Sequence, residues 1–176
     1  MFELSTACVV KDGKTLLRKG YGLADLAQHR PLTPDTVLRI ASLTKQFTAT
    51  AVLMLVDEGK IKLDDDITAY LPDYPTRGKK ITIEHLLTHT SGIVSFTSKP
   101  DLDDTTEYTV QQMIDSFKND PLEFEPGSHY KYNNSGYFLL GVILEKVSGK
   151  TYDKFLEERI FVPLGMGGTV TATKLP

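Results

Sequence analysis

The chain has 176 residues, 40% hydrophobic and 24% charged, so it is long enough and apolar enough to bury a core. Twenty lysine and arginine residues against 23 aspartate and glutamate residues give a net charge of −3, without the basic stripe that binds nucleic acid. Cys8 is the single cysteine, which excludes an internal disulfide framework and a cysteine-rich zinc site.

The first predicted element is a β-hairpin over residues 4–22. Asp12-Gly13 stands between two β-prone runs, and both residues tolerate the positive φ of a type I′ turn. A two-stranded hairpin alone is marginal in water and normally pairs with further strands. The later sequence offers one short β-prone stretch, residues 168–173, so we expect exposed hairpin edges that can promote self-association.

Helices are predicted from residue 37 onward. The clearest runs over residues 43–58, with Ser42 as its N-cap and Gly59 at its end. Further helices are expected from Thr82 to Leu87, from Thr109 to about Phe117, over residues 134–147, and from Thr151 to Ile160, with the three threonines as caps. Residues 72–80 and 95–106 are predicted to be loops.

Ser42 and Lys45 lie three residues apart at the start of the predicted helix 43–58, and therefore on one face of it. Residues 47–56 are apolar or weakly polar on every face, so we expect this helix to be buried all round. A lysine at the mouth of a buried helix is poorly hydrated, which favours its neutral form. A neutral amine beside a hydroxyl can take its proton and make it a nucleophile.

A serine three residues before a lysine is a common pairing in a chain of this composition, and it occurs twice. The simpler interpretation of Ser42 is a helix N-cap, with Lys45 on the surface. The second pair, Ser128 and Lys131, follows Pro126-Gly127, and we interpret it as a coincidence within a loop.

Tyr132-Asn133-Asn134 precedes another predicted buried helix. Tyr132 offers a phenol that can relay a proton, and Asn134 offers an amide that can orient a polar substrate. The alternative interpretation is an ordinary turn and N-cap, because asparagine is favoured there.

His85 and His89 are spaced i, i+4 and could share a metal ion. However, Leu86 stands where a metalloprotease motif has its glutamate, and no third ligand is evident, so we interpret both histidines as structural residues that bond nearby backbone. Asp64-Asp65-Asp66 lacks the alternate spacing and final glutamate of a calcium loop and is better interpreted as a solvated helix start. A metal-dependent function is therefore the weakest of the hypotheses.

Five short motifs occur in a fixed order along the chain. They are Ser42-Leu43-Thr44-Lys45, HLLTHTSG at 85–92, PG at 126–127, YNNSGY at 132–137 and PLGM at 163–166. With them the chain resembles the serine β-lactamase and penicillin-binding-protein superfamily. It is most similar to the branch with class C β-lactamases, D-Ala-D-Ala carboxypeptidases and related esterases, and the resemblance covers nearly the whole sequence.

The resemblance implies that Ser42 is the acylated nucleophile and that Lys45 is its general base. Tyr132 would shuttle a proton to the leaving group, and Asn134 would contact the substrate. The implied reaction is acyl transfer at an amide, β-lactam or ester carbonyl through an acyl-enzyme, with neither a metal nor an organic cofactor.

The implied fold is α+β and β-lactamase/transpeptidase-like, with one partial domain over residues 1–176. It would contain a sheet hairpin at 4–22 and a mostly helical lobe at 37–165. The family's third motif, Lys-Thr-Gly or His-x-Gly on a sheet strand, does not follow Asn134, so we expect a truncated chain without the C-terminal sheet strands. That strand also supplies an oxyanion-hole donor, whose loss typically costs about 10²–10³ in rate, so we expect weak or no turnover from this chain alone.

The alternative function is a non-catalytic binding or interaction module that keeps the fold. In either case we expect a small-molecule or peptidoglycan-like partner and no nucleic acid. The longest uncharged stretch of the first half, residues 46–56, is too short to span a bilayer. The resemblance suggests a periplasmic, secreted or cell-surface location, although no signal peptide is visible.

Overall fold

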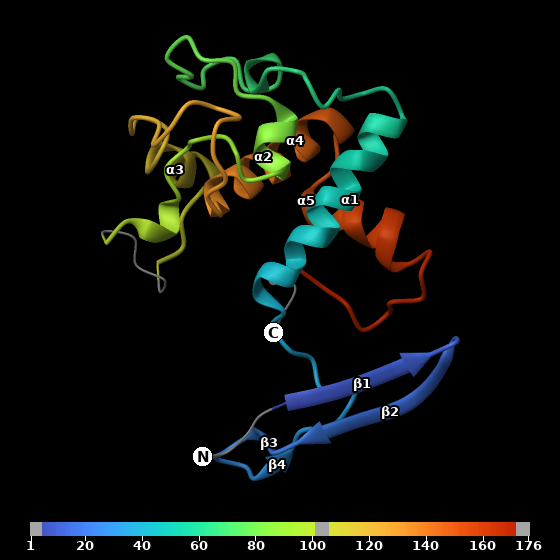
Figure 1. The fold of residues 1–176 in the computed structure, drawn as a ribbon. Coiled ribbons are helices and arrows are strands. Elements are labelled where there is room, and N and C mark those ends of the chain that lie inside the picture. Colours follow the sequence, from blue (N-terminus) through green and yellow to red (C-terminus); the bar gives the residue numbers. More distant parts are fainter. Residues whose placement is uncertain (1–4, 101–105, 172–176) are drawn as a thin grey trace. The chain divides into compact units, whose positions relative to one another are not determined.

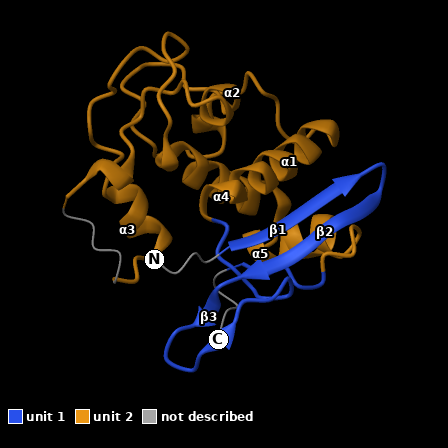
Figure 2. Cartoon of the chain, turned by 60° about the horizontal axis from the view of Figure 1, so that its bottom comes forward, with its two compact units in different colours: residues 1–40, 167–176 blue, residues 41–166 orange. Residues whose placement is uncertain are grey.

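The computed structural model describes residues 5–100 and 106–171, which divide into two compact units (Figure 2). Unit 1 contains the described residues of 1–40 and 167–176, and unit 2 contains Ala41–Met166. Figure 1 labels the strands and α-helices: β1 (Ser5–Lys11), β2 (Lys14–Tyr21), β3 (Leu23–Asp25), β4 (Arg30–Pro31), α1 (Thr44–Asp57), α2 (Ile83–Leu87), α3 (Val110–Asp115), α4 (Asn134–Ser148) and α5 (Tyr152–Leu156). The single partial domain expected over residues 1–176 stays a prediction.

The hairpin predicted at 4–22 is confirmed, although residue 4 lies outside the described residues. β1 and β2 pair antiparallel and end opposite each other at Lys11 and Lys14. Asp12 has φ +50° and Gly13 has φ +72°, the two positive angles that a type I′ turn requires.

A second antiparallel pair, β3 with β4, was not predicted. Asp25 accepts a hydrogen bond from the Gln28 N–H at 2.9 Å in the connecting turn, and strands of two and three residues are too short for a visible alternation. Gly20 is required beside this pair, because a Cβ there would lie 2.1 Å from the Leu32 carbonyl oxygen. The β-prone stretch at 168–173 forms no strand over its described residues, 168–171.

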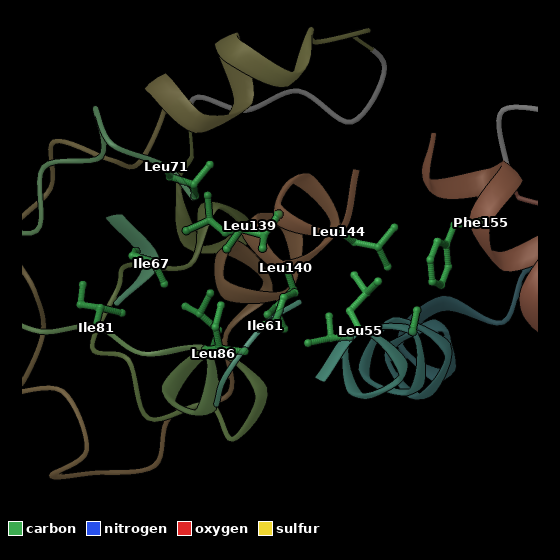
Figure 3. Close-up of a cluster of buried hydrophobic side chains, with 14 of the residues drawn as sticks. Leu55, Ile61, Ile67, Leu71, Ile81, Leu86, Leu139, Leu140, Leu144 and Phe155 are labelled. Carbon is green, nitrogen blue, oxygen red and sulfur yellow. The ribbon is translucent and has the colours of Figure 1, made fainter. Parts of the chain in front are cut away.

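α4 is the central helix of unit 2 and packs against α1, α2, α3 and α5. One stripe of α4 is fully buried, and Figure 3 shows three of its leucines among the side chains of the core. The stripe consists of Leu139, Leu140, Ile143 and Leu144. Each such side chain contributes about 1.5–3 kcal/mol by leaving water, so the core holds α4 in place.

α1 buries one side only, and the expectation that it would be buried all round is wrong. Thr48, Ala51, Val52 and Leu55 are buried at helical spacing, whereas Leu53 is 45% exposed. Apolar composition around a helix permits burial on every side, but packing partners decide which side is covered. Its contacts with α4 and α5 account for the buried stripe.

The helix caps are partly as predicted. Thr82 caps α2 by accepting the His85 N–H, and Thr109 caps α3 in the same way. α1 differs, because its N-cap is Leu43 and Ser42 lies inside a short 3₁₀ helix, Ala41–Leu43. The interpretation of Ser42 as an N-cap is therefore wrong, and its hydroxyl is available for other contacts.

The helix predicted over residues 134–147 is confirmed, because α4 begins at Asn134 and ends one residue later than predicted, at Ser148, with Asn133 as its N-cap. The last predicted helix differs at both ends. Thr151 precedes α5, but its hydroxyl donates to the Asp153 carboxylate instead of capping the backbone. The predicted helix to Ile160 ends its α-helical part at Leu156 and continues as a π-helical turn. None of the helices in the described ranges combines the length and apolar character that crossing a bilayer requires.

Candidate active site

Two motif segments of unit 2 are joined along their backbones. Residues 89–92 offer three carbonyl oxygens to N–H groups of residues 123–131 at 2.8–2.9 Å. The bonds run from Lys131 to His89, from Gly127 to Thr90 and from Glu123 to Gly92. This pairing brings the HLLTHTSG segment beside the residues that precede α4.

Gly92 makes this close approach possible. Its φ is +74°, and a Cβ at this position would lie 2.2 Å from the Phe124 carbonyl oxygen. A side chain would therefore be both strained and in collision with backbone.

Asn133 fixes the chain at the start of α4. Its side chain is nearly fully buried, accepts the Gly136 N–H at 2.7 Å and donates to the Ile93 carbonyl. Because Asn133 is held on both sides, Tyr132 before it and Asn134 after it have defined positions.

The structure brings together all four predicted site residues, from two segments about 90 positions apart. Tyr132 donates its phenolic O–H to Ser42 Oγ at 2.6 Å. Lys45 Nζ lies 3.4 Å from Ser42 Oγ and donates to Asn134 Oδ1 at 2.7 Å. Ser42 is exposed, so this cluster combines an accessible hydroxyl with two groups that can exchange a proton with it.

Lys45 is surrounded by groups that solvate its ammonium. Beyond Ser42 and Asn134, Nζ lies 4.7 Å from the ring centroid of Tyr132 and 5.5 Å from that of Tyr137. Faces of aromatic rings attract cations. The half-buried Lys45 therefore has polar and aromatic partners, and the poor hydration expected from the sequence stays a prediction.

The pKa of the Tyr132 phenol is lowered from its ordinary value of 10.0. Burial alone would raise this pKa, but the hydrogen bonds with Lys45 and Ser42 and the positive charge of Lys45 outweigh burial. A phenol with a lowered pKa gives up its proton more readily, which suits a proton relay.

Two residues that position Asn134 were missed by the sequence analysis. Asn134 donates from Nδ2 to Thr97 Oγ1 at 2.9 Å, and its backbone N–H donates to Ser95 Oγ at 3.2 Å. These bonds turn Asn134 Oδ1 towards Lys45. The partners lie almost 40 residues earlier in a loop, and the sequence carries no local signal for such contacts.

Both histidines have the structural role that was predicted. His85 Nδ1 accepts the Thr82 N–H at 3.2 Å, and His89 Nδ1 accepts the Asn133 N–H at 3.1 Å. Burial is the main cause that lowers the pKa of each below its ordinary 6.5. Over residues 5–100 and 106–171, no three His, Cys, Asp or Glu side chains gather in a way that could hold a metal ion.

The side chains of the second serine–lysine pair have separate partners. Ser128 donates to the Glu125 carbonyl and lies 2.8 Å from His129 Nδ1, while Lys131 pairs with Glu123. The coincidence predicted for this pair is thus confirmed, and Ser128 provides a natural control for Ser42.

A cavity of about 180 Å³ lies elsewhere in unit 2, between residues 71–74, α3 and α4. Its lining includes Tyr74, Ile114 and Val142 but none of the four residues around Ser42. We assign the site by the contacts around Ser42, because they bring reactive groups within bonding distance and the cavity does not.

Comparisons with known proteins identify the family to which the chain is similar. The family model described as Beta-lactamase matches residues 5–176. Penicillin-binding protein 4* of Bacillus subtilis (strain 168) is 35% identical over 168 residues, which cover 93% of this chain and 37% of that protein. The chain therefore spans little more than a third of the length of that relative.

Solved structures of similar proteins also match this chain over only part of their own length. D-amino acid amidase from Ochrobactrum anthropi SV3, complexed with L-phenylalanine amide, aligns with a TM-score of 0.86 and 36% identity, over 98% of this chain and 48% of that chain. EstCE1, described as a hydrolase with promiscuous acyltransferase activity, aligns with a TM-score of 0.83 and 26% identity, over 93% and 47% of the two chains. The predicted β-lactamase-like α+β fold is confirmed, and the chain corresponds to about half of each of these structures.

Proposed function

The chain belongs to the beta-lactamase family, and from that premise we propose that it is a serine hydrolase that forms an acyl-enzyme on Ser42. The observation that carries this proposal is the 2.6 Å contact between Tyr132 and Ser42 Oγ, with Lys45 Nζ beside both. The substrate would present an amide, β-lactam or ester carbonyl. One similar protein is a D-amino acid amidase and another is a hydrolase with promiscuous acyltransferase activity, which supports this range.

The first step is attack of Ser42 Oγ on the carbonyl carbon. The Tyr132–Lys45 pair has already lost one proton before this step, and it therefore accepts the proton of the Ser42 hydroxyl. The distances favour the Tyr132 oxygen as the atom that takes it, with Lys45 holding the positive charge. This differs from the family-based expectation that Lys45 itself is the base.

The second step is collapse of the tetrahedral intermediate. The bond to the leaving amine or alkoxide breaks, Tyr132 returns the proton to it, and the acyl group stays on Ser42. Water then attacks the acyl-enzyme, releases the acid and restores the serine. Asn134 Nδ2 has two hydrogens and bonds Thr97 through one of them, so the other can donate to a substrate carbonyl.

Labelling with a fluorescent penicillin and with a fluorophosphonate tests the proposal. The unchanged chain and Ser128→Ala should be labelled equally, whereas Ser42→Ala should lose the label. Ser128→Ala is a matched control because Ser128 also precedes a lysine by three residues. Equal labelling of Ser42→Ala would overturn the proposal. Binding of penicillin without any covalent label would instead favour the non-catalytic binding module.

A further inference from the structure

His89 is bonded to the backbone on both sides of Tyr132. Its carbonyl oxygen accepts the Lys131 N–H at 2.9 Å, and its Nδ1 accepts the Asn133 N–H at 3.1 Å. One residue thus holds the peptide groups immediately before and after the tyrosine that contacts Ser42.

The backbone of His89 is in the left-handed region, with φ +60°. This conformation is uncommon for residues other than glycine, although asparagine, aspartate and histidine adopt it more often than the rest. In the observed conformation both the carbonyl and the imidazole of His89 reach the same short segment, 131–133. The left-handed backbone of His89 is therefore associated with its two hydrogen bonds to this segment.

The imidazole of His89 also packs against the aromatic rings of the site. Its centroid lies 4.7 Å from the ring of Tyr132 and 4.9 Å from that of Tyr137, with interplanar angles of 38° and 32°. Tyr130 meets the same imidazole edge-on at 5.9 Å. Because Tyr132 is 43% exposed, these contacts restrict a ring that solvent would otherwise leave free to turn.

We propose that His89 is the positioning residue for Tyr132, holding the phenol against Ser42 Oγ, and that it does so only as the neutral imidazole. His89 does not touch Ser42 and acts through Tyr132. The inference rests on the function proposed for Ser42, and it adds a pH-sensitive support to that site.

The hydrogen bond from Asn133 sets the protonation state that this role requires. Nδ1 accepts, so the single ring proton of the neutral form lies on Nε2. Protonation of Nδ1 would direct an N–H at another N–H and break the bond. The charged and titratable groups that face His89 are Lys45 of α1, Tyr130 and Tyr132 of the segment before α4, and Tyr137 of α4.

Two variants of His89 separate its role as a hydrogen-bond acceptor from its ability to be protonated. In His89→Asn, the side chain tolerates the left-handed backbone and Oδ1 can accept the Asn133 N–H, but it cannot be protonated. In His89→Leu, the acceptor is lost. His29→Leu is the matched control, because His29 has φ +50° and lies in unit 1.

The rate of Ser42 acylation by a fluorophosphonate, measured from pH 5 to 8, tests the proposal. At pH 7.5 we expect His89→Asn, which keeps the acceptor but loses the ring contacts, to lose less than about tenfold, and His89→Leu, which loses both, to lose up to about 10²-fold, as misplaced catalytic groups do. Below pH 6.5 the unchanged chain should lose additional activity that His89→Asn does not lose. An unchanged rate in His89→Leu, or the same acid loss in His89→Asn, would overturn the proposal.

Nitrogen-15 NMR of the imidazoles tests the support without any substrate. At pH 7.5 His89 should carry its proton on Nε2, and the Asn133 amide resonance should shift as His89 is protonated. A proton on Nδ1 would overturn the proposal even if Ser42 reacts. Failure of Ser42 to react, with the NMR result as expected, would reject the proposed function but not the support of Tyr132.

Discussion

At the scale of single residues, the reactivity that we propose for Ser42 depends on the contacts that Lys45 makes with the residues around it. Lys45 Nζ donates to Asn134 Oδ1, lies 3.4 Å from Ser42 Oγ and faces the ring of Tyr132. Its charge is one of the reasons that the pKa of Tyr132 is lowered. The lysine therefore acts on the serine both directly and through the tyrosine.

Lys45→Met should raise the pKa of Tyr132, because it removes the hydrogen-bond partner and the charge that lower it. Acylation of Ser42 should fall by about 10²–10⁴, the usual contribution of a positioned acid or base. Carbon-13 NMR of the tyrosine Cζ atoms measures the pKa, and fluorophosphonate labelling measures the rate. Lys131→Met, which removes an exposed ion pair with Glu123, should change neither. An unaltered Tyr132 pKa in Lys45→Met would contradict this account.

The four residues of the proposed site were predicted from the sequence, but the residues that support them were not. Ser42, Lys45, Tyr132 and Asn134 belong to short motifs that can be recognised in a single chain. Thr97 positions Asn134 from 37 residues away, and such a contact depends on the tertiary fold. His89 bonds backbone, as predicted, but the sequence could not indicate that this backbone belongs to Asn133, 44 residues later.

At the scale of elements, the site depends on how firmly α1 and α4 are packed. α1 carries Lys45 in its first turn, and α4 begins at Asn134. Both helices bury one stripe in the common core of unit 2. The hydrogen bond between Lys45 and Asn134 therefore joins the starts of two helices that the core holds in contact.

Leu55→Ala should destabilise the protein by about 2–5 kcal/mol, because it leaves a cavity in the core that α1 shares with α4. Leu53→Ala makes the same chemical change on the same helix at a side chain that is 45% exposed. It should cost no more than about 0.5 kcal/mol. Urea unfolding followed by circular dichroism measures both. Equal losses in the two variants would contradict the burial pattern of α1.

Element types were easier to predict than element ends. The threonine caps of α2 and α3 could be predicted because a cap is a local interaction within four residues. The 3₁₀ helix at Ala41–Leu43, the π-helical turn after α5 and the β3–β4 pair could not. These features depend on packing and on short pairings that leave no periodic pattern in the sequence.

At the scale of the whole molecule, the resemblance to a known family predicted more of the fold than the hydrophobic pattern and the turn residues did. Periodicity indicated a hairpin followed by helices, whereas the five ordered motifs indicated the family and the fold. The exposed hairpin residues Val9, Val10 and Leu16 are consistent with strands that have few neighbours in the described residues. Self-association through these edges stays a prediction.

Stability should decrease as the pH falls from 7.5 to 5.5. The pKa values of His85 and His89 are lowered in the folded chain, so the unfolded chain binds more protons below about pH 6.5. Their contribution is complete above pH 6.5 and is lost as the pH falls towards the folded pKa values. Carboxylates with lowered pKa, such as Asp65, lose their contribution only at more acidic pH.

Urea unfolding at the two pH values measures this decrease, and His89→Asn should reduce it. His29→Asn removes an exposed histidine in unit 1 and should leave the decrease unchanged. Equal or greater stability at pH 5.5 would show that the two histidines are not held neutral by the fold.

The central claim is that Ser42 is the nucleophile, and peptide mass spectrometry after reaction with penicillin tests it most directly. Trypsin cleaves after Arg39 and Lys45 and releases residues 40–45, in which Ser42 is the sole serine. The account predicts that this peptide gains the mass of one penicilloyl group and that fragmentation assigns it to Ser42. An adduct on residues 119–131, which contain Ser128, or a chain without any adduct would contradict the account.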